Sequence, residues 1–107
     1  MTAIVSLSAG DRRLVRKILA AHLPPASTVW VFGSRATGRA RRYSDLDLAI
    51  DAGRPLSLDE VASLAEAFSD SDLPYRVDVV DWCAIDAGFR DIIAKARVKL
   101  APTKPAR

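Results

Sequence analysis

The stretch FGSRATGRARRYSDLDLAI, residues 32–50, decides the fold and carries the most unusual chemistry of the chain. It follows a β-branched and aromatic run that predicts a strand over residues 28–32, broken by Gly33. It ends in a second predicted strand over residues 46–50. Aspartate is disfavoured in strands, so the pair Asp45 and Asp47, one residue apart, needs a specific reason to be at this place.

Asp45 and Asp47 are predicted to share one face of the second strand, because side chains alternate between faces with a period of two. Leu46 and Leu48 would then point toward the core. The carboxylates would lie about 6–7 Å apart and raise each other's pKa unless a cation lies between them. A solvated strand edge would explain an isolated pair of this kind. The alternative is a Mg²⁺ site, because Mg²⁺ prefers carboxylate oxygens and keeps positions open for phosphates.

A third aspartate strengthens the metal interpretation. Asp78 lies between two valines of a predicted strand over residues 76–80, where a charge is costly unless it is paired or bound to metal. We therefore expect Asp78 to be the third ligand, and Asp81, at the strand exit, to cap the turn or the helix that follows. The alternative is that Asp78 is an edge-strand acid paired with Arg76 or Arg54.

The Gly33-Ser34 turn is the candidate phosphate-binding element. Glycine lets a phosphate approach the main chain, backbone N–H groups at such a turn bind anions, and the Ser34 hydroxyl can donate to a phosphate oxygen. The spacing and the Lys-Ser/Thr ending of a P-loop are absent. Arg35 is a candidate phosphate ligand because a guanidinium matches phosphate oxygens. The other arginines of this loop fit a solvated surface equally well.

The remaining chain predicts three amphipathic helices, over residues 8–22, 57–68 and 86–96, and a short edge strand over residues 98–100. The order of elements predicts an α/β fold with a small mixed sheet and helices packed on one face. Residues 1–100 would form a single domain. The basic, proline-rich residues 101–107 would form a disordered tail.

Composition narrows the class of protein. The chain has 107 residues, of which half are hydrophobic, and a net charge of +3, which suits anionic partners such as nucleotides, RNA or an acidic protein. Its single cysteine, Cys83, excludes an internal disulfide and fits the cytoplasm. No apolar run approaches the ~20 residues that a membrane helix needs, so no membrane association is expected.

Taken together, Gly33-Ser34, the segment Ser44-Asp45-Leu46-Asp47-Leu48 and the downstream Asp78 resemble the nucleotidyltransferase superfamily typified by DNA polymerase beta. The short chain resembles the minimal nucleotidyltransferases of bacteria and archaea. The resemblance implies a polymerase-beta-like fold, with two Mg²⁺ ions held by Asp45, Asp47 and Asp78. It also implies a site for ATP or another nucleoside triphosphate that includes Gly33, Ser34, Arg35 and Ser44.

The resemblance also implies a partner. Such transferases are often encoded beside a small helical protein, either a HEPN-type toxin or a nucleotidyltransferase substrate-binding protein. In some pairs the transferase is the antitoxin and adds AMP to a tyrosine of the toxin. The expected function is therefore Mg²⁺-dependent transfer of AMP to a hydroxyl of such a partner, in a homo- or hetero-oligomer. The alternatives are an inactive module that neutralises the partner by occlusion, and a nucleic-acid-binding protein suggested by the arginines alone.

Overall fold

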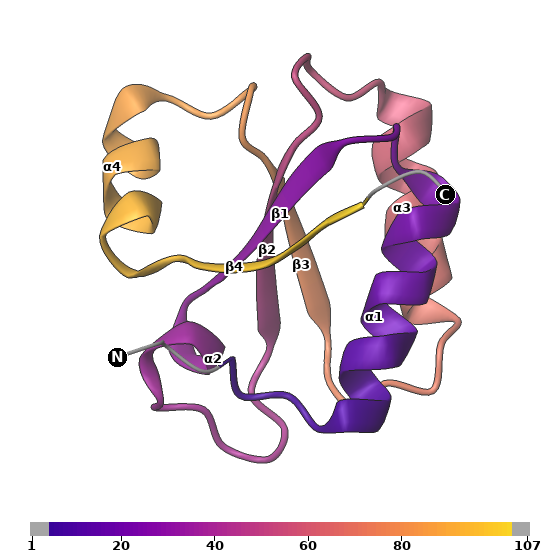
Figure 1. The fold of residues 1–107 in the computed structure, drawn as a ribbon, viewed down its shortest axis with the longest axis vertical. Helices are drawn as coiled ribbons and strands as arrows, with labels where there is room; N and C mark the ends of the chain where they lie inside the picture. The colour runs from indigo at the N-terminus through magenta and orange to yellow at the C-terminus, as the bar shows by residue number, and fades with distance from the viewer. Residues whose placement is uncertain (1–4, 104–107) are drawn as a thin grey trace.

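The structure is a computed structural model that describes residues 5–103. Helices and strands follow one another along the chain, and the first helix and the first strand are joined by a short turn (Figure 1). The elements are α1 (Ala9–His22), β1 (Ser27–Phe32), α2 (Ser34–Thr37), β2 (Leu46–Asp51), α3 (Leu58–Ser69), β3 (Val77–Asp81), α4 (Ala87–Ala96) and β4 (Val98–Thr103). Each predicted helix and strand is present, with small differences at the ends.

Side-chain caps fix where the long helices begin. The Ser8 hydroxyl accepts a hydrogen bond from the backbone N–H of Asp11 at 3.0 Å and starts α1. Ser57 and Glu60 form a complete capping box at the start of α3. The Asp86 carboxylate accepts from the backbone N–H of Phe89 at 2.8 Å and starts α4. Because these caps satisfy N–H groups that have no partner within the helix, they account for the helix starts that the sequence predicts.

The four strands form one mixed sheet in the order β3-β2-β1-β4. β1 runs antiparallel to both β2 and β4, whereas β2 and β3 run parallel and are connected through α3. In this register Asp47 lies between Phe32 of β1 and Asp78 of β3. The pairing therefore sets the second predicted acid directly beside the third.

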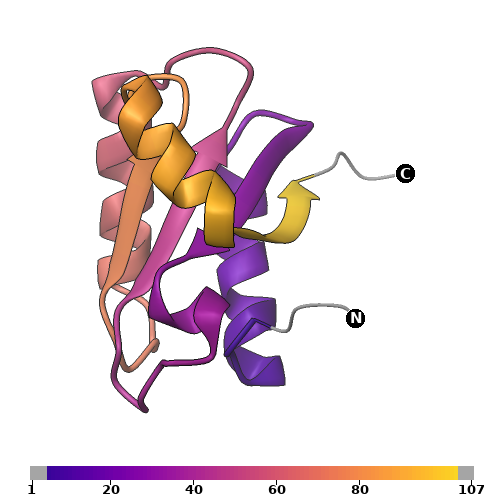
Figure 2. The ribbon, with the colours of Figure 1, turned by 90° about the vertical axis from the view of Figure 1, so that its left-hand side faces the viewer.

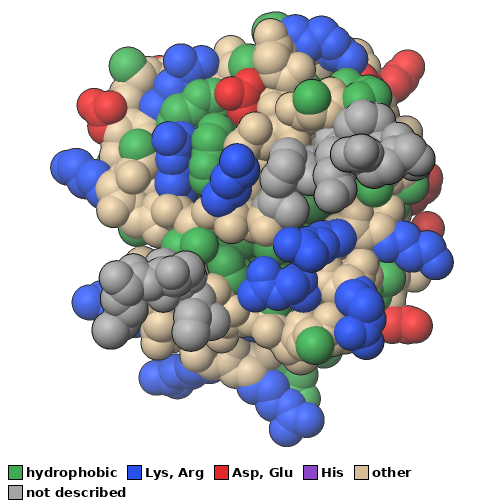
Figure 3. Space-filling model, viewed as in Figure 1, with side chains coloured by type: hydrophobic (Ala, Val, Ile, Leu, Met, Phe, Trp, Pro, Cys, Tyr) green, Lys and Arg blue, Asp and Glu red, His purple; other side chains and the backbone are tan. Residues whose placement is uncertain are grey.

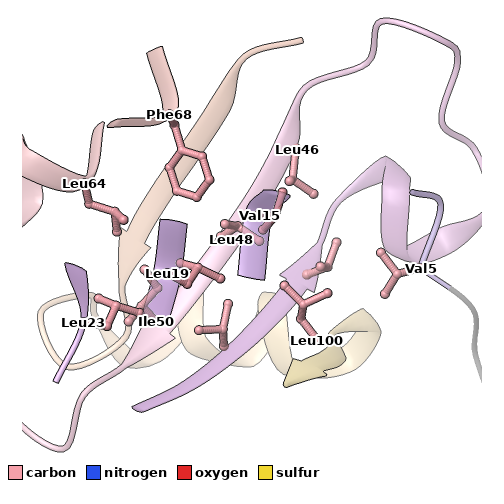
Figure 4. Packing of buried hydrophobic residues seen from close by; sticks show 12 residues of the cluster. Val5, Val15, Leu19, Leu23, Leu46, Leu48, Ile50, Leu64, Phe68 and Leu100 are labelled. Carbon is pink, nitrogen blue, oxygen red and sulfur yellow. The ribbon is translucent and has the colours of Figure 1, made fainter. Parts of the chain in front are cut away.

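One face of the sheet is covered by α1 and α3 (Figures 1 and 2). Here the even-numbered apolar residues of β2 are fully buried, as predicted for Leu46 and Leu48. They pack with side chains of both helices in one hydrophobic cluster (Figure 4). That cluster includes Val15, Leu19, Leu46, Leu48, Ile50, Leu64 and Phe68. Burial of this face requires the odd-numbered aspartates of β2 to project from the other one.

The predicted fold class is confirmed, but α4 lies on the opposite side of the sheet from α1 and α3 (Figures 1 and 2). Its Phe89 meets Phe32 edge to face, with the ring centroids 6.1 Å apart. The physical reason is that β1 is apolar on both faces, because Trp30 and Phe32 alternate with two buried valines. The second apolar face needs its own cover, and α4 provides part of it.

The last strand is longer than predicted. β4 pairs with β1 as far as Thr103, past residue 100 where the sequence placed the end of the domain. Pro102 lies within it, which is compatible with an edge strand because a missing N–H costs little there. The rest of the predicted tail, residues 104–107, lies outside the described residues. No helix in the described part of the chain has the length and apolar character to cross a membrane.

The surface reflects the positive net charge. Lys and Arg side chains are spread over the face seen in Figure 3, and Asp and Glu are fewer there. This distribution agrees with the expectation of an anionic ligand or partner, without indicating which one.

Candidate functional site

Strand register brings the three predicted acids together on the α4 side of the sheet. Asp47 and Asp78 are direct partners in the parallel β2–β3 pair, and Asp45 lies immediately before β2. Burial raises the pKa of the Asp47 carboxyl, and the charges of Asp78 and Asp45 raise it further. The three carboxylates are therefore close enough to repel one another. This excess of negative charge is what a site for a divalent cation requires.

Arg76 stands beside two of these acids. Its guanidinium lies 3.7 Å from an Asp45 carboxylate oxygen and 3.6 Å from one of Asp78. The Arg76 side chain is 75% exposed, and Asp45 and Asp78 are nearly half exposed. The ion pair between Asp78 and Arg76 that the sequence left open as an alternative is thus present. It does not account for Asp47, whose carboxyl keeps its raised pKa.

Gly33 lies against the central acid. Its φ of 72° and ψ of −155° belong to a region that only glycine adopts without strain. A Cβ placed on Gly33 would overlap Oδ2 of Asp47 and lie 3.3 Å from its Cγ. The turn after β1 and the beginning of β2 therefore approach so closely that any side chain at Gly33 would have to displace the Asp47 carboxylate. The sequence predicts that Gly33 lets a phosphate approach the main chain. The structure shows that Gly33 also leaves the space that the Asp47 carboxylate occupies.

Ser34 begins the short helix α2 directly after Gly33. Its carbonyl accepts from the backbone N–H of Gly38 and, at 3.1 Å, from that of Arg39, so the turn closes on itself. Among the described residues, no hydrogen bond is formed by the Ser34 hydroxyl. The turn is thus held by its backbone, and the hydroxyl is available for a ligand next to the acids.

Arg35 occupies a different place from the one expected for a phosphate ligand. It is only 5% exposed, and its guanidinium donates to the backbone carbonyls of Ser6 at 2.8 Å, Ser44 at 2.8 Å and Arg42 at 3.1 Å. The same group stacks on the Tyr75 ring at 3.9 Å. Arg35 therefore ties the N-terminal segment to the loop before β2. No sequence pattern indicates this role, because the acceptors are backbone atoms from distant segments.

Ser44 orders the same loop. Its hydroxyl accepts a hydrogen bond from the backbone N–H of Arg41 at 2.8 Å, and its carbonyl accepts from Arg35. These bonds fix the chain immediately before Asp45. Ser44 thus contributes to the placement of the first acid through the backbone.

Tyr75 connects this scaffold to α1. Its hydroxyl donates to an Asp11 carboxylate oxygen at 2.9 Å. Burial, then the hydrogen bond and charge of Asp11, raise the pKa of the Tyr75 hydroxyl. Tyr75 is therefore a neutral structural side chain. A cavity of about 670 Å³ is lined by Tyr75, Asp11 and Arg35 among others, and none of the three acids lines it.

Asp81 plays the capping role that the sequence predicts. Its two carboxylate oxygens accept from the backbone N–H of Leu56 at 2.8 Å and of Cys83 at 3.1 Å. It thereby fastens the exit of β3 to the loop before α3. Asp51 similarly accepts from the backbone N–H of Gly53 at 2.8 Å and closes a turn. Neither acid belongs with the group around Asp47.

The fit to a metal rests on the donor chemistry of the acids. Within residues 5–103, no three His, Cys, Asp or Glu side chains already converge as a ready-made metal cluster. Asp47 and Asp78 nevertheless pair across β2 and β3, and the charges of Asp78 and Asp45 both act on Asp47. Oxygen donors of this kind, with mutual repulsion that a cation would relieve, suit a hard divalent ion.

Comparisons with known proteins agree with this geometry. A family described as "Polymerase beta, Nucleotidyltransferase" matches residues 14–104. The "Probable protein adenylyltransferase MntA" of Haemophilus influenzae is 46% identical over 99 residues, which cover 92% of this chain and 87% of that protein.

Solved structures show the same similarity. A crystal structure of a toxin–antitoxin with AMP-PNP superposes with a TM-score of 0.74 and 25% identity, over 85% of this chain and 73% of that one. A structure named as a minimal nucleotidyltransferase superposes with a TM-score of 0.64 and 31% sequence identity, over 83% of this chain and 88% of that one. The resemblance carried by Gly33-Ser34 and the three aspartates is thus confirmed, and the chain belongs to the polymerase beta nucleotidyltransferase family.

Proposed function

We propose that this nucleotidyltransferase transfers AMP from ATP to a hydroxyl of a small helical HEPN-type partner, as the antitoxin of a toxin–antitoxin pair. The single observation that carries the chemistry is the register that sets Asp47 beside Asp78, with Asp45 next to them on the same side of the sheet. The relation to the adenylyltransferase MntA supports AMP as the transferred group. The likeness to a toxin–antitoxin structure with AMP-PNP supports both the nucleotide and the class of partner.

Asp45, Asp47 and Asp78 would hold two Mg²⁺ ions. When bound, such ions supply positive charge to the attacking and leaving oxygens of an in-line phosphoryl displacement. The three acids offer carboxylate oxygens on one face, and their mutual repulsion favours the binding of a cation. Asp45 and Asp78 are nearly half exposed, so their side chains are free to turn toward an ion.

Gly33 and Ser34 would hold the β- and γ-phosphates. Gly33 has no side chain between the turn and Asp47, so a phosphate can approach the backbone next to the acids. The Ser34 hydroxyl would donate to a phosphate oxygen. Arg35 and Ser44 would act indirectly, because their polar groups are engaged in holding the loop before Asp45.

In the transfer step, the acceptor hydroxyl oxygen forms a bond to the α-phosphorus of ATP. The bond from that phosphorus to the bridging oxygen breaks, and pyrophosphate leaves with the electron pair. Asp78 would help to accept the hydroxyl proton, because it is the acid on the strand edge and is partly exposed. The protein thus contributes positioning and charge, which are the main requirements of phosphoryl transfer.

The test is transfer of labelled AMP from ATP to the helical protein encoded beside this chain, in the presence of Mg²⁺. The wild type should label the partner, and the double variant Asp45→Asn/Asp47→Asn should not. The matched control is Asp70→Asn/Asp72→Asn, which removes the same charge from two exposed residues after α3 and should label the partner normally. Full transfer by the first double variant would exclude the proposed site. A stable complex without transfer by the wild type would favour the occlusion alternative.

The proposal also places the protein in the cytoplasm. Transfer to a toxin that acts inside the cell requires ATP, which the cytoplasm supplies, and the single Cys83 is compatible with a reducing compartment. Fractionation of cells that express the tagged chain would test this.

A further inference from the structure

We propose that Arg76 is a built-in competitor of the metal: its guanidinium holds Asp45 and Asp78 before a divalent cation binds and must be displaced from them when it does. The inference rests on the proposed function only in taking these acids as the metal ligands. It assigns to this chain a residue that sets how tightly the site binds its ion.

The geometry singles out Arg76 for this role. It lies immediately before β3 and two residues before Asp78, and its backbone carbonyl accepts from the N–H of Leu46 at 2.8 Å. The β2–β3 register also sets Arg76 beside Asp45. Leu46 pairs with Val77, and Asp45 and Arg76 are the residues immediately before them. One guanidinium thus contacts Asp78 of β3 and Asp45, which lies immediately before β2.

The distances show that this guanidinium can be displaced. Its nitrogens lie 3.6 and 3.7 Å from the carboxylate oxygens, longer than the ~3.2 Å limit of a good hydrogen bond. Its side chain is 75% exposed, so water can replace the carboxylates at little cost. By contrast, Arg35 is buried and bonded to several carbonyls, and it could not move in this way.

The charges show why the competition matters. One guanidinium lies within 4 Å of two of the three carboxylates of the proposed metal site. Arg76 pairs with those two acids, Asp45 and Asp78. A divalent ion at the site must therefore break both ion pairs, which lowers its affinity. Removal of the guanidinium should raise that affinity.

The experiment measures Mn²⁺ affinity by calorimetry, without nucleotide or partner, for the wild type and three variants. Arg76→Gln should bind Mn²⁺ about two- to tenfold more tightly, which is the range expected for two exposed ion pairs. Arg76→Lys keeps the charge and should remain close to the wild type. Arg54→Gln is the matched control, because it removes an exposed, ion-paired arginine that is bonded to Glu60, and it should change nothing.

Each outcome decides the proposal. Unchanged or weaker Mn²⁺ binding by Arg76→Gln would overturn it, and so would the absence of Mn²⁺ binding by all four proteins. Circular dichroism and thermal melting establish that the variants are folded. The proposed function is scored separately by AMP transfer: transfer by the wild type with no affinity change in Arg76→Gln rejects only the role of Arg76. Tighter binding by Arg76→Gln without any AMP transfer rejects only the proposed function.

Discussion

Gly33 lies so close to Asp47 that a single added carbon at Gly33 would overlap the Asp47 carboxylate. The contact joins the turn after β1, which is the proposed phosphate-binding turn, to the beginning of β2, which carries Asp47. A change in the backbone of the proposed phosphate-binding turn therefore also changes the position of the Asp47 carboxylate.

Replacement of this glycine should affect activity more than stability. In Gly33→Ala, the backbone conformation costs about 1–3 kcal/mol of unfolding free energy. The added carbon also pushes the Asp47 carboxylate aside, and a displacement of about 1 Å at a reacting centre can reduce the rate by ~100-fold. We expect AMP transfer to fall by at least that factor, measured with labelled ATP on protein shown to be folded.

The control for this variant is Gly53→Ala. Gly53 also has a positive φ, 79°, but no atom lies within 4 Å of a Cβ placed there. It should therefore lose about 1 kcal/mol of stability and keep its transfer rate. Equal loss of activity in the two variants would show that backbone strain, and not contact with Asp47, explains the effect.

Removal of the Asp47 charge should reduce AMP transfer without reducing the stability of the fold. The folded state raises the pKa of this carboxyl, so above that pKa the charged form destabilises the fold. In the presence of a chelator at pH 7, Asp47→Asn should be as stable as the wild type or more stable, by about 0.5 kcal/mol at most because the site is screened by solvent. Transfer should drop by about 100-fold or more.

The pH dependence gives the sign of this effect. As pH falls through the raised pKa of Asp47, the wild type takes up a proton in the folded state before the unfolded state does, and it gains stability. The difference in unfolding free energy that favours Asp47→Asn over the wild type should therefore shrink as pH is lowered from 7 toward 4. Urea unfolding at several pH values measures it, and an advantage that grows toward acid would contradict the assigned cause.

The sequence predicts which residues of β2 face the core better than it predicts how the strands pair. Strand periodicity is local, so it correctly set Leu46 and Leu48 in the core and Asp47 on the opposite face of β2. The pairing of Asp47 with Asp78 depends on the register between two strands joined through α3, which periodicity does not determine.

Arg35 shows a second limit of the sequence. An arginine in a basic, glycine-punctuated loop reads as an exposed phosphate ligand. Its burial depends on carbonyls of Ser6 and Ser44, which only the folded chain brings to it. The position of α4 has a similar cause, because the pattern of β1 shows apolar residues on both faces but does not say which helix covers each.

Substitution of Arg35 should accordingly lower the free energy of unfolding. Arg35→Met would leave several partly buried carbonyls without a donor and remove the stacking on Tyr75, at a cost of about 2–4 kcal/mol in unfolding free energy. Arg35→Lys should recover little, because one ammonium cannot reproduce the planar fork. Arg39→Met, at an exposed position in the same loop, should stay within about 0.5 kcal/mol. A loss of ATP binding with unchanged urea unfolding would instead favour direct contact of Arg35 with the nucleotide.

Substitutions of Asp78 and Asp81, which are three residues apart, should have opposite effects on stability and on AMP transfer. Asp81→Ala removes the acceptor for two backbone N–H groups and should cost about 1–3 kcal/mol of stability, while the folded protein keeps AMP transfer within about threefold. Asp78→Asn should leave stability within about 0.5 kcal/mol, because the side chain is nearly half exposed, and should reduce transfer by about 100-fold or more. Urea unfolding and labelled transfer on the same preparations measure both quantities. If Asp78→Asn lost stability but kept its activity, Asp78 would be an edge-strand partner of Arg76 and not a ligand of the catalytic metal.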